Sequence, residues 1–235
     1  MSGGRVGHSS TADGAKGAAD RFVFFSDADA VVAIALTLLA IELPVPEGTS
    51  ASELAAAFDH GFSEYLAFCI SFVVIFLHWN GHHRLFRYLT DAPPALVRWN
   101  GLWLFAIVLT PFVTKVLTGG DGEGSAFPWR FGLYALAQVV AGLGFLMTAL
   151  TMRREGVVDA GAPQGVVGHS ITRILGLIVV FGLSIPFAFV FGQWAYFVWG
   201  FGQPVYFVLL RLSRRRTTPR EEEPAPDHTT PTSQD

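Results

Sequence analysis

Residues 21–44 read RFVFFSDADAVVAIALTLLAIELP, and this stretch decides the fold. The part from Ala30 to Ile41 carries no charge, while two acids precede it and one follows it. At about 1.5 Å rise per residue, a helix from Arg21 to Leu43 is roughly 34 Å long, enough to cross a hydrocarbon core of about 30 Å. The stretch therefore predicts a first transmembrane helix.

One face of this helix carries bulky apolar side chains. Ile34, Leu38 and Ile41 follow the i, i+4, i+7 spacing of a single helical stripe, with Thr37 at its edge. Such a stripe can pack against another helix or face lipid. It can also form the wall of a pore, where a ring of these side chains makes a hydrophobic constriction. Periodicity alone leaves both interpretations open.

Composition places the whole chain in a membrane. Its 235 residues are 51% hydrophobic and only 15% charged, with a mean hydropathy of +0.43, which is too apolar for an ordinary soluble domain. No basic groove for nucleic acid is apparent, and the single cysteine, Cys69, excludes a disulfide framework and a CxxC metal site. The signatures GxSxG, HExxH and the P-loop are absent, so we expect no enzyme.

Apolar runs further along the chain predict an all-α membrane protein with six transmembrane helices. An acidic loop with a short amphipathic piece, Ser52 to Phe58, follows the first helix. The other five spans are expected at about Ser63–Asn80, Trp99–Leu117, Trp129–Thr151, Ile171–Phe191 and Trp194–Leu212.

The basic residues give the orientation of these spans. Of the 16 lysines and arginines, all except Lys115 and Arg130 fall on the side of the membrane that holds the amino terminus. By the positive-inside rule, both termini are cytoplasmic. We therefore expect residues 1–20 to be a flexible cytoplasmic tail, residues 21–212 the transmembrane domain, and residues 213–235 a disordered, charged cytoplasmic tail.

Two sequence patterns resemble a known family. The motif Arg21-x-x-x-Phe25-Ser26-Asp27, with the apolar helix after it, resembles the signature first helix of the endolysosomal potassium channel family (transmembrane protein 175 type) and its prokaryotic branch. The stretch that contains Trp79, His82 and His83 is similar to the family's second-helix pattern.

The resemblance implies an architecture and a site. It implies a homotetramer in which the first helices of four subunits surround the pore, without a TVGYG carbonyl filter. Ile34, Leu38 and Ile41 then correspond to the rings of bulky apolar residues at the narrowest part of the pore, and Thr37 to the threonine beside them.

The first helix departs from the family pattern in one place. The spacing from Asp27 to Ile34 is two residues longer than in the family, as though Asp-Ala had been duplicated. In an unbroken helix, Asp27 lies near the Ile34 stripe and four copies make an acidic ring at the cytoplasmic mouth. If the chain bulges at residues 28–30, Asp27 packs against the second span and Asp29 is a spare residue. We favour the bulge, because it preserves three matched residues.

Ionisable residues near the cytoplasmic ends of the first two spans have alternative roles. His78 and His82 have a spacing that can hold a metal or haem, but no second cluster supplies further ligands. We expect His78, His82 and His83 to be interfacial and hydrogen-bonded to Ser or Asp of the first helix. Arg21 with Asp27 or Asp29 can form a proton relay or a structural ion pair, and the position near a helix end favours the structural role.

The sequence thus predicts a potassium-preferring, leak-type cation channel in a prokaryotic cell membrane. Its expected partners are three further copies of the chain, the lipid bilayer and permeant monovalent cations such as K⁺; no other cofactor and no nucleic acid are expected. The alternative is a secondary transporter of an ion or small solute, with a midplane site at helices broken by Pro111 and Pro186. Against a transporter, no span has an acid at its middle and no inverted repeat is evident. A membrane-embedded haem or redox protein is the third class considered.

Overall fold

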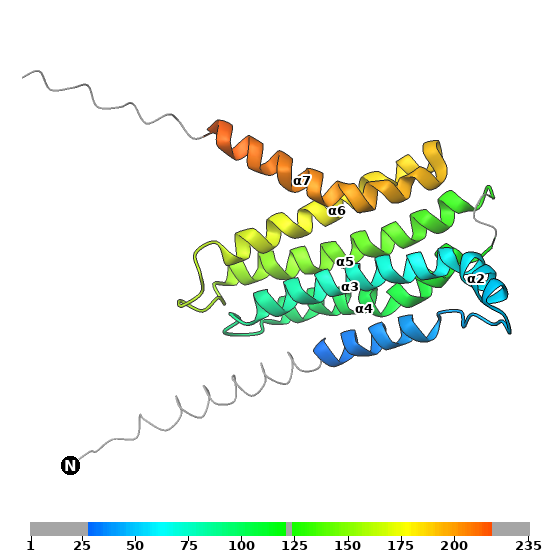
Figure 1. Cartoon of the computed structure of the whole chain (residues 1–235). Helices are drawn as coiled ribbons and strands as arrows, with labels where there is room; N and C mark the ends of the chain where they lie inside the picture. Colours follow the sequence, from blue (N-terminus) through cyan, green and yellow to red (C-terminus); the bar gives the residue numbers. More distant parts are fainter. Residues whose placement is uncertain (1–27, 121–123, 218–235) are drawn as a thin grey trace, which may run out of the picture.

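The chain folds into a bundle of long helices. The computed structural model describes residues 28–120 and 124–217, with side chains through Leu212. Over these residues the fold is all-α, as predicted, and Figure 1 shows the long helices lying side by side with the short α2 at one end.

Each predicted span corresponds to one helix. In chain order the elements are the first helix Ala28–Ile41, α2 Ala51–His60, α3 Phe62–Phe86, α4 Pro94–Thr118, α5 Phe127–Glu155, α6 Val166–Phe191, the 3-10 helix η1 Gly192–Trp194 and α7 Ala195–Thr217. Helices α3 to α6 contain 25, 25, 29 and 26 residues. At about 1.5 Å per residue they are roughly 38 to 44 Å long, so their ends extend beyond a hydrocarbon core of about 30 Å.

Four helical stretches among the described residues are long and apolar enough to cross a membrane. They are α3, α4, α5 and the continuous stretch Val166–Leu212. That last stretch holds two of the predicted spans, because the chain folds back between α6 and α7 at Gly192, whose φ of 58° suits glycine. The first helix, Ala28–Ile41, is a shorter apolar helix within the described residues. Residues 21–27, which the sequence assigns to the same span, lie outside them.

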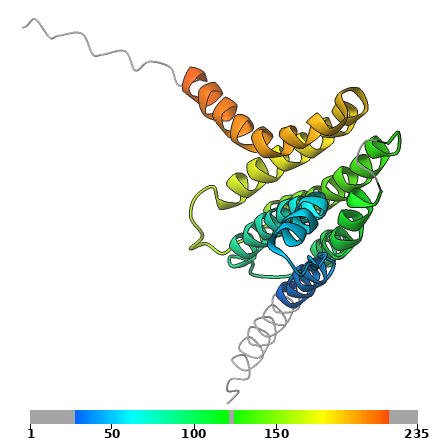
Figure 2. The ribbon, with the colours of Figure 1, turned by 45° about the vertical axis from the view of Figure 1, so that its right-hand side comes forward.

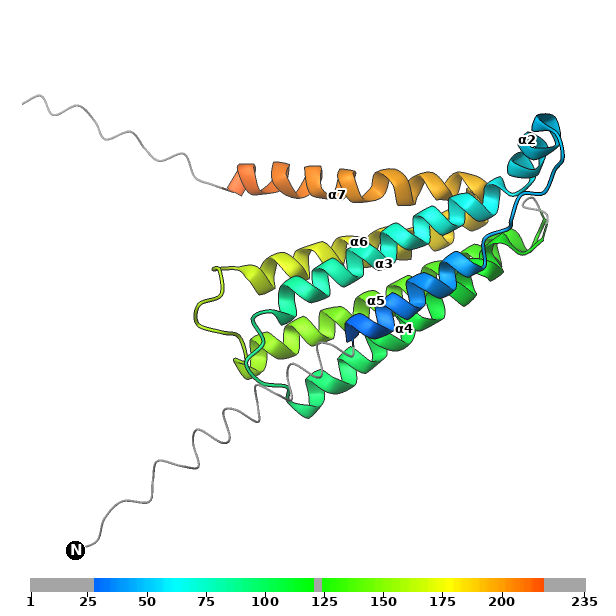
Figure 3. The same ribbon diagram turned by 60° about the horizontal axis from the view of Figure 1, so that its bottom comes forward.

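The helix directions match the predicted alternation. Figures 1 and 3 show that the first helix, α4 and α6 run one way, while α3, α5 and α7 run the other way. The loops 87–93 and 156–165 therefore share one end of the bundle, and α2 and η1 lie at the opposite end. We call these the loop end and the α2 end.

The two connections at the loop end are joined to each other. Leu89 and Val158 form an isolated antiparallel bridge. Beside it, the N–H of Asp159 donates to the carbonyl of Tyr88 at 2.8 Å. These backbone bonds fix the end of α3 relative to the end of α5.

Two predicted boundaries are corrected by the structure. Helix α7 continues to Thr217, beyond the predicted end at Leu212, where the sequence is basic and positive charge favours a C-terminal helical turn. The predicted amphipathic piece forms α2, which begins at the capping box Ser50-Ala-Ser-Glu53. The Glu53 carboxylate accepts from the backbone N–H of Thr49 at 2.8 Å, and this hydrogen bond lowers the pKa of Glu53. The tails 1–20 and 218–235 lie outside the described residues.

Polar side chains join three helices inside the bundle. Ser71 of α3 lies 2.8 Å from the Thr114 hydroxyl of α4 and 3.0 Å from the Tyr134 hydroxyl of α5, and all three residues are buried. In a membrane such bonds satisfy groups that have no water as an alternative partner. The cluster therefore fixes α3, α4 and α5 as one unit.

Close approach of backbones holds α4 against α5. A Cβ added at Gly144 of α5 would lie only 2.7 Å from the backbone nitrogen of Trp103 in α4. A small residue is therefore required at this helix crossing.

We expect Gly144→Ala to destabilise the protein by about 1–3 kcal/mol, since neither backbone can move away without disturbing the packing. The matched control is Gly101→Ala on α4, where an added Cβ meets nothing within 4 Å. Thermal unfolding of the detergent-solubilised variants measures both effects. Equal midpoints for the two variants would contradict this account of the α4–α5 contact.

Candidate functional site

The first helix has one face inside the bundle. Its buried residues follow the i, i+4, i+7, i+11 spacing, and each is at most 2% exposed. They are Ala28, Val32, Ala35 and Leu39. This face packs into the core of the bundle, and its two alanines allow a close approach.

The predicted stripe lies on the other face of the same helix. Ile34, Leu38 and Ile41 are 58%, 47% and 78% exposed. The stripe therefore does not pack against the described helices of its own subunit. It is left for lipid, for another copy of the chain or for a pore.

Thr37 is exposed beside this stripe. Its hydroxyl donates to the carbonyl oxygen of Ile34 at 2.8 Å. Because the hydroxyl proton is used inside the helix, the Thr37 oxygen can act only as an acceptor toward an outside group. A cation is one group that such an oxygen can contact.

Asp29 anchors the first helix to α3. The indole N–H of Trp79 donates to Asp29 Oδ1 at 2.8 Å, and His83 Nδ1 lies 3.9 Å from Asp29 Oδ2. The expectation that Asp29 is a spare residue is therefore wrong, and residues 28–30 are helical instead of bulged. Asp27 and the other motif residues Arg21, Phe25 and Ser26 lie outside the described residues.

Helix geometry explains the role of Asp29. Five residues at about 100° each place Asp29 roughly 140° around the helix from Ile34. Asp29 therefore lies on the side of the helix that faces α3, away from the exposed stripe. Asp29 reaches this side without a break in the helix.

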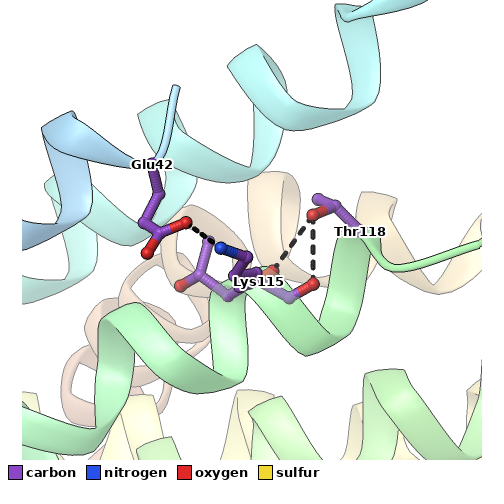
Figure 4. Close-up of polar contacts among 4 residues, drawn as sticks. Glu42, Lys115 and Thr118 are labelled. Atoms are coloured by element: carbon purple, nitrogen blue, oxygen red, sulfur yellow. Dashed lines mark hydrogen bonds and ion pairs between the residues drawn. The ribbon is translucent and has the colours of Figure 1, made fainter. Parts of the chain in front are cut away.

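A second set of polar contacts holds the other end of the first helix. Glu42, just after the helix, pairs with Lys115 of α4, and Figure 4 shows the two side chains meeting near Thr118. The Tyr65 hydroxyl of α3 donates to the carbonyl of Pro44 at 2.8 Å. The Glu42–Lys115 pair is exposed and contributes at most about 1 kcal/mol, so its main effect is on position.

His82 packs against α4 in the part of the chain that the structure describes. It is buried between the rings of Trp103 and Phe86, whose centroids lie 4.2 Å and 3.8 Å away. Its Nε2 donates to Asn100 Oδ1 of α4 at 2.9 Å. His78 is buried as well, and its Nδ1 accepts from the indole N–H of Trp103 at 3.2 Å. Both histidines therefore join α3 to α4. The predicted hydrogen bonds to Ser26 or Asp27 of the first helix stay a prediction, because those two residues lie outside the described residues.

The same geometry separates the two kinds of residue on α3. Neighbouring residues point about 100° apart on a helix, and here His82 and His83 are directed to different neighbours. Trp79 and His83 face the first helix, whereas His78 and His82 face α4. The polar Asn100 inside an apolar span was the available signal for this contact, because a buried amide needs a partner.

Known proteins are similar in sequence to the part of the chain that contains the first helix, α3 and most of α4. The sequence model of the family described as "Endosomal/lysosomal potassium channel TMEM175" matches residues 21–111. A potassium channel of Streptomyces collinus is 30% identical over 161 residues, which cover 66% of this chain and 78% of the relative. A potassium channel of Chamaesiphon minutus is 37% identical over 91 residues, which cover 38% of this chain and 45% of the relative.

Solved structures share the fold. The crystal structure of a lysosomal potassium-selective channel TMEM175 homologue from Chamaesiphon minutus aligns with a TM-score of 0.64 at 20% identity, over 85% of this chain and 100% of that one. A variant of the potassium channel MtTMEM175, crystallised with a nanobody–MBP fusion protein, aligns with a TM-score of 0.54 at 19% identity, over 81% of this chain and 92% of that one.

The anchor between Asp29 and Trp79 gives a prediction. We expect Asp29→Ala to cost about 1–3 kcal/mol of stability, because the half-buried indole N–H of Trp79 loses its acceptor. Asp29→Asn keeps an acceptor oxygen, so it should lower the stability by less than Asp29→Ala does. Unfolding of the purified protein measures both changes.

A double-mutant cycle with Trp79→Phe isolates the contact. The two substitutions should couple, so that Asp29→Ala costs much less in the Trp79→Phe background. Additive effects would mean that this hydrogen bond does not stabilise the protein. The exposed loop acid Asp91, changed to Ala, is the matched control for removal of one negative charge.

Proposed function

The chain belongs to the TMEM175 family of potassium channels, and on that premise we propose that it is a potassium-preferring, leak-type channel whose pore is lined by the first helix. The observation that carries the proposal is the exposed stripe of Ile34, Leu38 and Ile41 on a helix whose opposite face is buried. Polar contacts at Asp29 and Glu42 hold this helix in one rotation. The stripe is thereby presented outward at a fixed angle.

A homotetramer supplies the rest of the pore. One exposed helix face cannot enclose a channel, so several copies must close a ring around a common axis. The family resemblance gives four as the number of copies. In this assembly each apolar residue of the stripe becomes a ring of four side chains.

The rings form a hydrophobic constriction in place of a carbonyl filter. Along the helix, the ring of Ile34 lies about 6 Å from that of Leu38, and Leu38 about 4.5 Å from Ile41. Such rings pass ions only when water and ions enter a narrow apolar space. Potassium gives up its hydration water more readily than sodium does, and the acceptor oxygen of Thr37 offers partial compensation. These two effects together account for a preference for potassium.

The charges of the bundle support one orientation in the membrane. Arginines gather at the loop end, whereas Lys115 and Arg130 lie toward the α2 end. By the positive-inside rule the loop end is cytoplasmic, and both termini are on that side. The bacterial sources of the relatives support a prokaryotic cell membrane as the location.

Ile34→Asn tests the constriction. An amide ring at this position should widen and wet the narrow part, so potassium current rises and the preference for potassium over sodium falls. Cation flux through protein reconstituted in liposomes, with sodium or potassium gradients, measures both quantities.

The matched control for this variant is Leu183→Asn on α6, which places the same amide on an exposed apolar position far from the first helix in sequence. It should leave the selectivity unchanged. If Ile34→Asn also leaves current and selectivity unchanged, the constriction is not at this stripe.

Ile41→Cys in a Cys69→Ser background tests the assembly. Ile41 is 78% exposed, so in the proposed ring its cysteine faces the cysteines of other subunits and oxidation should give covalent dimers. Cross-linking of lysines and native mass spectrometry should show four subunits. A conducting monomer, or no dimers from Ile41→Cys while an outward Leu183→Cys control cross-links, would overturn the architecture.

A further inference from the structure

A cavity of about 740 Å³ lies between α3, α6 and α7. No residue of the first helix is among those that line it, and Figures 1 and 2 show the first helix and α7 on opposite sides of the bundle. The cavity is therefore separate from the proposed pore.

One part of the cavity is cationic. Its basic lining residues are Arg84 of α3, Arg87 just after α3, and His169 and Arg173 of α6. No aspartate or glutamate is among the described lining residues. Within the part of the chain that the structure describes, none of the three arginines makes an ion pair. This concentration of uncompensated positive charge is suited to an anion.

The rest of the cavity is apolar. Leu77 lies seven residues before Arg84 on α3, about 10 Å further along the helix axis, and other apolar residues join it from α5, α6 and α7. They are Phe145, Ile174, Leu177 and Phe207. The lining thus changes from basic at the loop end to apolar toward the middle of the bundle.

His78 lies in the α3 wall of this cavity. The indole N–H of Trp103 can only donate, so His78 Nδ1 accepts it and the neutral ring carries its proton on Nε2. His78 is 2% exposed, lines the cavity, and its Nε2 has no partner among the described residues. The Nε2 atom is itself covered by the protein, so the arginines and the apolar wall are the groups that face a ligand in the cavity.

We propose that this cavity binds one anionic phospholipid of the cytoplasmic leaflet. The arginines hold the phosphate headgroup, and one acyl chain covers the apolar wall. An inorganic anion satisfies the arginines but leaves that wall uncovered, which is why the lining favours a lipid. The inference uses the membrane orientation proposed above and is independent of ion conduction.

Native mass spectrometry of the purified protein tests the site. Dioleoyl phosphatidylglycerol should bind to one saturable site per subunit and with higher affinity than dioleoyl phosphatidylcholine. The pair Arg84→Gln and Arg173→Gln should weaken phosphatidylglycerol binding by about fivefold for each arginine removed. Arg153→Gln with Arg154→Gln is the matched control, because these arginines lie at the same end but do not line the cavity.

A filling variant tests the apolar part without a change of charge. A Cβ at Gly81 would lie 3.7 Å from the Phe145 ring, an ordinary contact, and Gly81 lines the cavity, so we expect the rest of the Gly81→Leu side chain to extend into it. It should lower phosphatidylglycerol binding. Normal unfolding midpoints for all these variants show that the fold is retained.

Three outcomes would overturn the proposal. They are equal affinity for the two lipids, equal loss in the cavity and control arginine pairs, or displacement of phosphatidylglycerol by inorganic phosphate, which would identify a free-anion site. Flux through the same preparations separates this inference from the channel function. Selective lipid binding without ion flux would contradict the proposed channel function but would still support the lipid site.

Discussion

The polar anchoring of the first helix at its two ends is the constraint on which the proposed pore depends. Between apolar helices in lipid there is little hydrophobic force to choose one rotation over another. The contact of Asp29 with Trp79 at one end, and of Glu42 with Lys115 at the other, makes that choice. Given this rotation, Ile34 is exposed and the opposite face, with its two alanines, Val32 and Leu39, is buried. The identity of the exposed face is therefore set by two hydrogen-bonded carboxylates.

The sequence predicts the helices well because each is a long apolar run that ends at charged or glycine-rich segments. It also predicts which face of the first helix carries the bulky residues, since periodicity depends on nothing outside the helix. It does not predict the contact of His82 with α4, because periodicity assigns a residue to a face but does not say which helix lies there. The partner of His82 is Asn100 of α4, brought near by the packing of α4 on α3 and α5. That arrangement is a property of the whole bundle.

The error at Asp29 has a different origin. Matching Phe25, Ser26 and Asp27 to a motif favoured a bulge over an unbroken helix, and so treated Asp29 as surplus. The buried spacing of Ala28, Val32, Ala35 and Leu39 shows that the helix is regular from residue 28. A regular helix places Asp29 toward α3 by rotation alone. Helix geometry thus predicts the position of Asp29 better than the match to the sequence motif does.

Helix α3 connects the proposed lipid site to the anchor of the pore helix. His78 lines the cavity, and Trp79, the next residue, holds Asp29. Both are part of one unbroken helix, which the buried contacts of Ser71 and His82 join to α4. A rotation of α3 that improves the fit of a lipid against the α3 wall of the cavity therefore also moves the indole that fixes the first helix. A lipid would change the pore through this route only by binding one rotation of α3 more tightly than another, since differential affinity is the only source of such a shift.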